Sequence, residues 1–168
     1  YEGNRPNSNN DHRENKKSKH DYSSHPVRID HQSYNRNYRP VSSIDMKHYH
    51  KYSHNKSHFY GYEGIYYRPY NNGYVRYAPT NGFRINILPR GYVTINIGHN
   101  PYYFYEGVYY RPYRNVYEVV QAPIGAIVYA LPAGYERVDY NGDRLYEFGG
   151  TLYQRIYSRV SVAYQVVG

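Results

Sequence analysis

One cluster of side chains in the sequence could bind a metal ion. The stretch "HYHKYSHNKSH" spaces His50, His54 and His58 by four residues, with His48 beside them. On a helix this spacing would align the imidazoles on one face, and imidazole is a ligand for zinc, copper and nickel. The surrounding Asn, Ser and Lys residues instead favour a polar, disordered tract that is rich in histidine. We therefore expect no resident cofactor, and metal sequestration by this segment is an alternative function.

A second set of residues combines aromatic rings with guanidinium groups. The phrase "YEGIYYRPY" begins at Tyr62 and returns as "YEGVYYRPY" at Tyr105. Arg68 and Arg111 each stand two residues from a tyrosine on either side, which allows guanidinium groups to stack on rings. The favoured interpretation is contacts within the scaffold; the alternative is an exposed ladder that binds a sugar chain, peptidoglycan or a strand-rich protein. The candidate binding residues are Tyr66, Tyr67, Arg68, Tyr109, Tyr110 and Arg111.

The sequence does not supply a convincing catalytic set. From residue 59 onward there is a single histidine and no cysteine, so a nucleophile, a base and an orienting group cannot be assembled. Glu63 and Glu106 occupy equivalent turns and could form paired carboxylates for glycoside cleavage, but the third copy has Gly149 at that position. We therefore expect no enzymatic activity.

The elements that carry these residues are repeated along the chain. Gly64, Gly107 and Gly150 are separated by two equal steps of 43 residues, and "ILPRGYV" at 87–93 returns as "ALPAGYE" at 130–136. Such a period indicates a supersecondary repeat unit. The sequence predicts a partial unit at 59–79 and full units at 80–123 and 124–168.

Alternation with a period of two predicts strands inside each unit. In "FRINI" at 83–87 the apolar residues share one face, and "YVTINI" and "VSVAYQVV" alternate in the same way. Glycine turns such as Asn141-Gly142 separate the strands, and Pro69 and Pro112 suggest edge strands. The predicted fold is all-β, with repeated antiparallel units of 43 residues that form either tandem SH3-like barrels or one continuous meander.

The first 58 residues differ in composition from the rest. They hold five Ile, Leu, Val, Met or Phe residues and no alanine, so they cannot bury enough apolar surface to offset the entropy of ordering. They also hold 11 Lys and Arg against 6 Asp and Glu, which makes them basic. We expect 1–58 to be a flexible basic tail and 59–168 to be a tyrosine-rich β-repeat domain.

Charge and hydropathy limit the kinds of partner and the cellular compartments that we expect. The formal charge of +8 favours anionic partners, but no RNA-binding or DNA-binding motif accompanies the basic tail, so nucleic acid is not expected. No run approaches the roughly 18 to 20 apolar residues of a membrane helix. The first residue is tyrosine, which indicates that the sequence starts after a processed signal peptide or at an artificial boundary. The absence of cysteine excludes disulfides and is compatible with either redox compartment.

The segment "GAIVYALPAGYERVDYNGDRLYEFGGTLYQRIY" at 125–157 resembles a tyrosine-rich family of exported bacterial proteins, common in Gram-negative envelopes, that carries a domain of unknown function. The resemblance covers about the last hundred residues, and its marks are Gly125, Leu131-Pro132, Gly134-Tyr135, Asn141-Gly142, Gly149-Gly150 and Tyr153. It implies export and a β-rich fold, and no catalytic residues. The long tail and the arginine-rich strands depart from the family pattern.

Together these features predict a non-enzymatic module of the cell envelope. We expect a subunit or accessory of a larger envelope complex, or a binder of glycan and peptidoglycan surfaces, in the periplasm or at the outer membrane of a Gram-negative bacterium. The expected partners are an envelope protein or an anionic glycan or lipid surface. A structural tyrosine-rich matrix protein is a further alternative.

Overall fold

The structure, a computed structural model, describes residues 37–157 and 160–168, and these residues form an all-β fold without a helix. This confirms the fold class that the alternation predicted. The strands are β1 (His50–His54), β2 (Ser57–Tyr62), β3 (Ile65–Tyr70), β4 (Gly73–Arg76), β5 (Arg84–Ile85), β6 (Val93–Ile97), β7 (Asn100–Tyr105), β8 (Val108–Tyr113), β9 (Val116–Val120), β10 (Ile127–Val128), β11 (Glu136–Tyr140), β12 (Asp143–Phe148), β13 (Thr151–Tyr157) and β14 (Val162–Val166).

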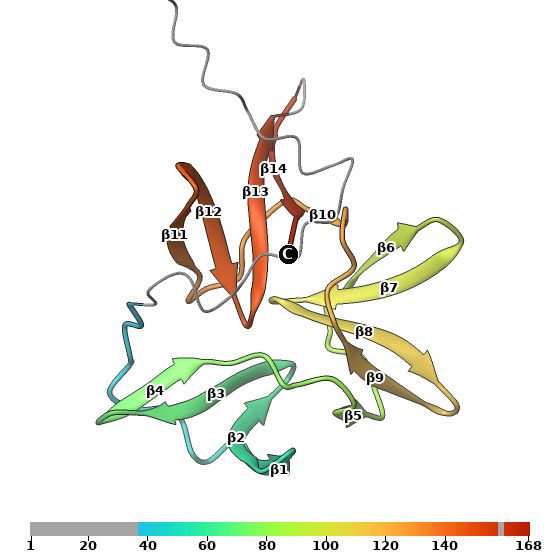
Figure 1. Cartoon of the computed structure of the whole chain (residues 1–168). Helices are drawn as coiled ribbons and strands as arrows, with labels where there is room; N and C mark the ends of the chain where they lie inside the picture. Colours follow the sequence, from blue (N-terminus) through green and yellow to red (C-terminus); the bar gives the residue numbers. More distant parts are fainter. Residues whose placement is uncertain (1–36, 158–159) are drawn as a thin grey trace, which may run out of the picture.

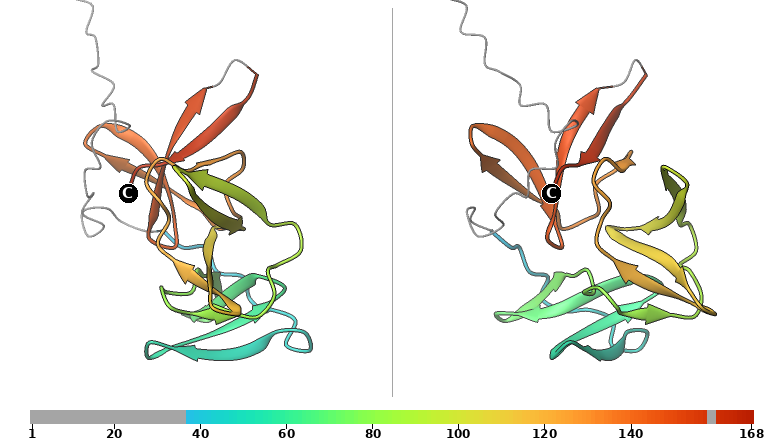
Figure 2. Two further views of the ribbon diagram at one scale, coloured as in Figure 1. Left: turned by 90° about the vertical axis from the view of Figure 1, so that its right-hand side faces the viewer. Right: turned by 45° about the vertical axis from the view of Figure 1, so that its right-hand side comes forward.

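The strands form three separate antiparallel sheets, one for each repeat unit. The first sheet has the order β1-β2-β3-β4, the second β5-β9-β8-β7-β6, and the third β10-β14-β13-β12-β11. Figure 1 shows the three sheets arranged around a common centre, and Figure 2 shows the same arrangement from two other sides. The chain is therefore not one continuous meander, because each unit keeps its own sheet with two open edges.

The 43-residue step seen in the sequence is a step between equivalent strands. His50, Val93 and Glu136 begin β1, β6 and β11, each 43 residues after the one before. The same step relates β2, β7 and β12, which begin at 57, 100 and 143. The turns between the central strands repeat too: Glu63 and Gly64 both have positive φ (47° and 80°), as a two-residue type I′ hairpin requires.

The first unit is more complete than the sequence predicted. β1 and the first two residues of β2 lie within the predicted tail, whose residues 1–36 are outside the described part. Val41 forms an isolated bridge with Tyr74, in the place that β5 and β10 take in the other units. The sequence "HKYSH" of β1 has no aliphatic alternation, and the strand forms because it pairs with β2, where the Tyr52 ring stacks on Phe59.

Pro69 and Pro112 lie in central strands, so the prediction that they mark edge strands is wrong. Each proline is close to the end of its strand. The ladder from β2 to β3 covers only 65–67 of β3, and the ladder from β7 to β8 covers only 108–110 of β8. Each ladder ends before it reaches the proline, so the missing N–H interrupts none of the paired positions on that side.

Two apolar cores hold the second sheet between the other two. Tyr110 packs with Phe59, Tyr66 and Phe83 of the first core, on the side of the first sheet. Tyr109, the preceding residue, packs with Phe148 of the second core, on the side of the third sheet. Since successive residues of a strand point to opposite faces, the first half of β8, residues 108–110, is buried on both faces. A sheet covered on both sides explains why tyrosine occupies both faces of this strand.

The two cores contain equivalent pairs of tyrosine hydroxyls. The Tyr66 hydroxyl lies 3.4 Å from that of Tyr110, and the Tyr109 hydroxyl lies 3.0 Å from that of Tyr153. Tyr109 and Tyr153 lie 43 residues after Tyr66 and Tyr110, respectively, so the same contact occurs at two successive unit boundaries. The next copy of the first partner is Leu152, which has no hydroxyl and packs in a small core with Val138, Leu145 and Val167.

Arg76 at the end of β4 connects all three units. Its guanidinium lies 3.6 Å from the Glu106 carboxylate in the second unit and 5.8 Å from the centre of the Phe148 ring in the third. It also lies 5.7 Å from the centre of the Tyr67 ring in its own sheet. A half-buried cation with an ion pair and two ring contacts fixes the position at which the hairpins converge.

We expect the Tyr109–Tyr153 hydrogen bond to show strong coupling in a double-mutant cycle. Tyr109→Phe or Tyr153→Phe alone leaves one buried hydroxyl without its partner and should cost roughly 1–3 kcal/mol. The double variant removes both hydroxyls from a shape that is otherwise kept, so its stability should lie close to that of the wild type. Denaturant unfolding of the four chains measures this, and strictly additive costs would contradict it.

Candidate functional site

Three of the six predicted binding residues lie inside the protein. Tyr66, Tyr109 and Tyr110 have at most 4% of their surface exposed and make the core contacts described above. They cannot form an exposed ladder, because the neighbouring sheets cover the faces from which they point. At these three positions the structure has the scaffold contacts that the sequence favoured.

The other three predicted binding residues reach the surface but do not form one ladder. Tyr67 is half-buried, and its ring meets Tyr49 edge-on at 5.7 Å. Arg68 lies 5.3 Å from the centre of the Tyr70 ring, as the spacing predicted. Arg111 is exposed and lies over Tyr102 of β7 instead of a ring of its own strand. A binding role for these residues stays a prediction.

The four histidines do not gather into a common site. His50 and His54 are in β1 and His58 is in β2, so the helix assumed for their alignment is wrong. His58 pairs with Ser53 and therefore lies on the opposite face of the hairpin from His50 and His54. His48 interacts with Asp45 at 2.6 Å. Among the residues that the structure describes, no group of three or more His, Cys, Asp or Glu side chains could hold a metal ion.

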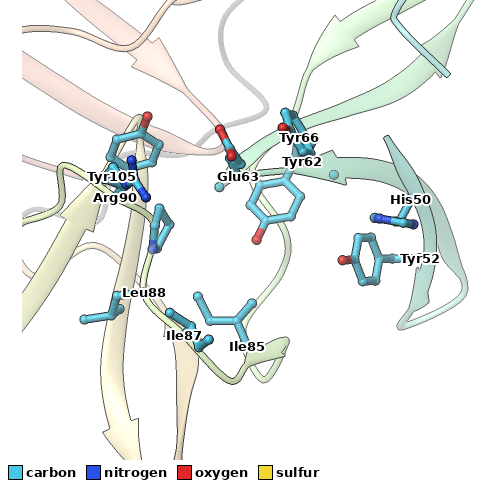
Figure 3. Close-up of a pocket in the computed structure, with 13 residues that line it drawn as sticks. His50, Tyr52, Tyr62, Glu63, Tyr66, Ile85, Ile87, Leu88, Arg90 and Tyr105 are labelled. Atoms are coloured by element: carbon cyan, nitrogen blue, oxygen red, sulfur yellow. The ribbon is translucent and has the colours of Figure 1, made fainter. Parts of the chain in front are cut away.

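A pocket of about 480 Å³ lies between the first and second units, and we call it the first interunit pocket. Figure 3 shows His50 and Tyr52 on one side of it and Arg90 and Tyr105 on the other. The pocket lies at the ends of β1, β2 and β7 and against the loop after β5. Its lining consists of His50, Tyr52, Gly61, Tyr62, Glu63, Gly64, Tyr66, Ile85, Ile87, Leu88, Pro89, Arg90 and Tyr105.

Local sequence explains how this pocket forms. The Glu63-Gly64 turn ends the hairpin at a point where Gly64 approaches Pro89 of the "LPRG" loop, which leaves no room for a side chain. The pocket remains beside this contact because β1 ends the first sheet and leaves Tyr52 with 37% of its surface exposed. Both segments recur in the sequence, Glu63-Gly64 as Glu106-Gly107 and "LPRG" as "LPAG". This repetition was the signal in the sequence that could have indicated a contact between units.

The first interunit pocket presents both signs of charge among aromatic rings. The Glu63 carboxylate raises the pKa of the Tyr62 hydroxyl next to it, because a second negative charge at this position is unfavourable. Arg90 is exposed, and in the described part of the chain it forms no ion pair. The site therefore offers an acceptor, a cationic donor and several ring faces to a ligand.

An equivalent pocket of about 390 Å³ between the second and third units has a different chemistry. Val93 and Ile95 line it at the positions that His50 and Tyr52 take in the first pocket. The repeat partner of Arg90 is Ala133. We call this the second interunit pocket. Glu106 keeps the position of Glu63, but the repeated fold forms without equivalents of His50 and Arg90, which identifies these two residues as the candidate functional feature.

Comparison with known proteins yields one match, which spans nearly the whole chain. A family described as "Family of unknown function (DUF6515)" matches residues 5–168, well beyond the last hundred residues on which the resemblance in the sequence was based. No curated protein and no solved structure matches the chain.

Proposed function

Because the chain belongs to this family of unknown function, we propose its role from its own surface: a non-enzymatic module that binds a glycan of the cell envelope. The protein is exported and works in the periplasm or at the outer membrane of a Gram-negative bacterium. The observation that carries the proposal is the placement of His50 and Arg90 among tyrosine rings in the first interunit pocket, at positions where the second unit and the third have Val93 and Ala133.

The chemistry of the first interunit pocket suits a sugar. Tyr52 and Tyr105 offer flat apolar faces against which the C–H face of a sugar ring can pack. Glu63 accepts hydrogen bonds from hydroxyl groups, and Arg90 donates them and pairs with a carboxylate. The formal charge of +8 favours an anionic glycan over a neutral one.

Binding without cleavage fits the same lining. Hydrolysis by the usual mechanism needs two carboxyl groups that flank the glycosidic bond. Glu63 is the single acidic residue among those that line this pocket, and Glu106 is the single one in the second.

Among the described residues there is no helix long and apolar enough to cross a membrane.

The proposal predicts that the full chain co-sediments with purified peptidoglycan sacculi through the first interunit pocket. Arg90→Ala and His50→Ala should each weaken this binding about tenfold, because each removes a direct ligand contact. Both side chains are exposed, so the fold should survive both changes. Thr94→Ala in the second interunit pocket is the control and should leave binding unchanged. The proposal would be refuted if the sacculi bound neither the wild type nor any variant, or if they bound all variants equally. Stronger binding of the wild type to phosphatidylglycerol vesicles than to sacculi would point to lipid as the ligand instead.

A further inference from the structure

The outer edge of the second sheet differs from the other sheet edges. β6 pairs with β7 on one side, and no other strand in the described part of the chain pairs with it. Figure 1 shows it at the outer end of the second sheet. An edge strand presents a row of backbone N–H and C=O groups that another strand can pair with. Among the described strands, β6 is a five-residue edge with the uncharged sequence "VTINI".

The other edges carry features that oppose strand pairing. β5 and β10 have two residues each, and β4 is met by the Val41 bridge. β1 contains the exposed Lys51 between its two histidines. β11 contains Arg137 and Asp139, both exposed. Short strands, covering segments and charged side chains are the usual means by which proteins protect sheet edges. Within residues 37–157 and 160–168, β6 has none of them.

We propose that β6 is a self-association surface, and that two copies of the chain pair antiparallel along it to form one continuous ten-stranded sheet from the two five-stranded sheets. The sequence of β6 is self-complementary about Ile95. A two-fold axis there places Val93 opposite Ile97 of the second copy, and Thr94 opposite Asn96. Apolar residues then meet apolar ones and polar residues meet polar ones, with no like charges opposed.

The neighbouring surface favours the same arrangement and one register. Val93 and Ile95 line the second interunit pocket together with Ile127 and Tyr129, which are 39% and 74% exposed. A second strand beside β6 would add its own Val93 and Ile97 next to this apolar surface and remove part of it from water. A slip of one residue would place apolar residues opposite polar ones, so the two-fold register is preferred.

The occupant is a second copy because the pattern of β6 needs no other sequence to complete it. The contact is a short ladder, so we expect a monomer–dimer equilibrium that depends on protein concentration. Each copy carries a formal charge of +8, and the resulting repulsion opposes association. Added salt screens this repulsion and should therefore strengthen the dimer.

The test is sedimentation velocity of the full chain, whose mass is 20.0 kDa, from low to high micromolar concentration. The wild type should shift to twice this mass. The variant Thr94→Lys/Asn96→Lys opposes lysines across the two-fold axis and should stay monomeric, as should Thr94→Glu/Asn96→Glu. A mixture of these two variants should form a heterodimer, because lysine then meets glutamate. All four substitutions are at exposed positions, and far-UV circular dichroism checks the fold.

Ser53→Lys is the matched control, because Ser53 takes the place of Asn96 in β1 and is also exposed. This variant should dimerise like the wild type. A wild type that stays monomeric at every concentration would overturn the proposal, even if β6 captured a different protein. A double-lysine variant that still dimerises, or variants of opposite charge that fail to pair, would overturn it as well. Glycan binding is measured separately, so failure of one proposal leaves the other standing.

Discussion

Replacing Gly107 with alanine is expected to remove a large part of the stability of the protein. Gly107 has φ of 89°, a left-handed conformation that costs an alanine roughly 1–2 kcal/mol. The added Cβ would also overlap the ring of Phe148 and lie 2.9 Å from Pro132. Phe148 is 2% exposed and cannot move aside without disturbing the second core, which adds roughly 1–3 kcal/mol. The total of roughly 2–5 kcal/mol is a large share of the free energy of unfolding of a typical domain.

Gly150→Ala provides a control with the same backbone strain and without the overlap. Gly150 is the equivalent turn residue of the third unit, has φ of 86°, and an added Cβ there would meet nothing within 4 Å. We expect this variant to lose roughly 1–2 kcal/mol, from the conformational cost alone. Denaturant unfolding gives both values. Equal losses at the two positions would show that the hairpin of the second unit does not press against the third.

The sequence predicted the strands and their repetition because both depend on local pattern. Alternating apolar residues specify a strand, and Gly64, Gly107 and Gly150 specify the turns that recur with the 43-residue step. β1 was missed because its histidines and lysine give no such pattern, and the strand is stabilised by pairing with β2. A strand whose stability comes from its neighbour leaves little signal in its own residues.

The candidate site could not be predicted because it depends on how the sheets pack. Local alternation places Tyr109 and Tyr110 on opposite faces of a strand, but it does not reveal that a further sheet covers each face. Tyr66, Tyr109 and Tyr110, which the spacing alone could also place on an exposed ladder, therefore lie in the core. The first interunit pocket joins Tyr62 of one unit to Arg90 of the next, a contact across units that spacing within one unit cannot show.

A rise in pH above about 10 is expected to unfold the protein. Burial raises the pKa of the hydroxyls of Tyr109, Tyr110 and Tyr153 far above the ordinary value of 10.0. In the unfolded chain these hydroxyls lose their protons near pH 10, whereas in the folded chain they keep them. Above that pH the unfolded state binds fewer protons than the folded state. The stabilisation is therefore complete below pH 10 and is lost progressively as the pH rises toward the folded-state pKa values.

Three such groups lower the free energy of unfolding by roughly 4 kcal/mol for each pH unit above 10. A domain at the lower end of the usual range of stability, roughly 5 kcal/mol, should therefore unfold at about pH 11. Near-UV circular dichroism follows the loss of packing, and tyrosinate absorbance should rise in the same step. The Tyr109→Phe/Tyr153→Phe variant keeps one of the three groups and should show about one third of this slope, so its transition moves to higher pH. If all tyrosines ionised near pH 10 while the near-UV signal stayed native, these three hydroxyls would have to be accessible to water, and the two-sided burial of β8 would be wrong.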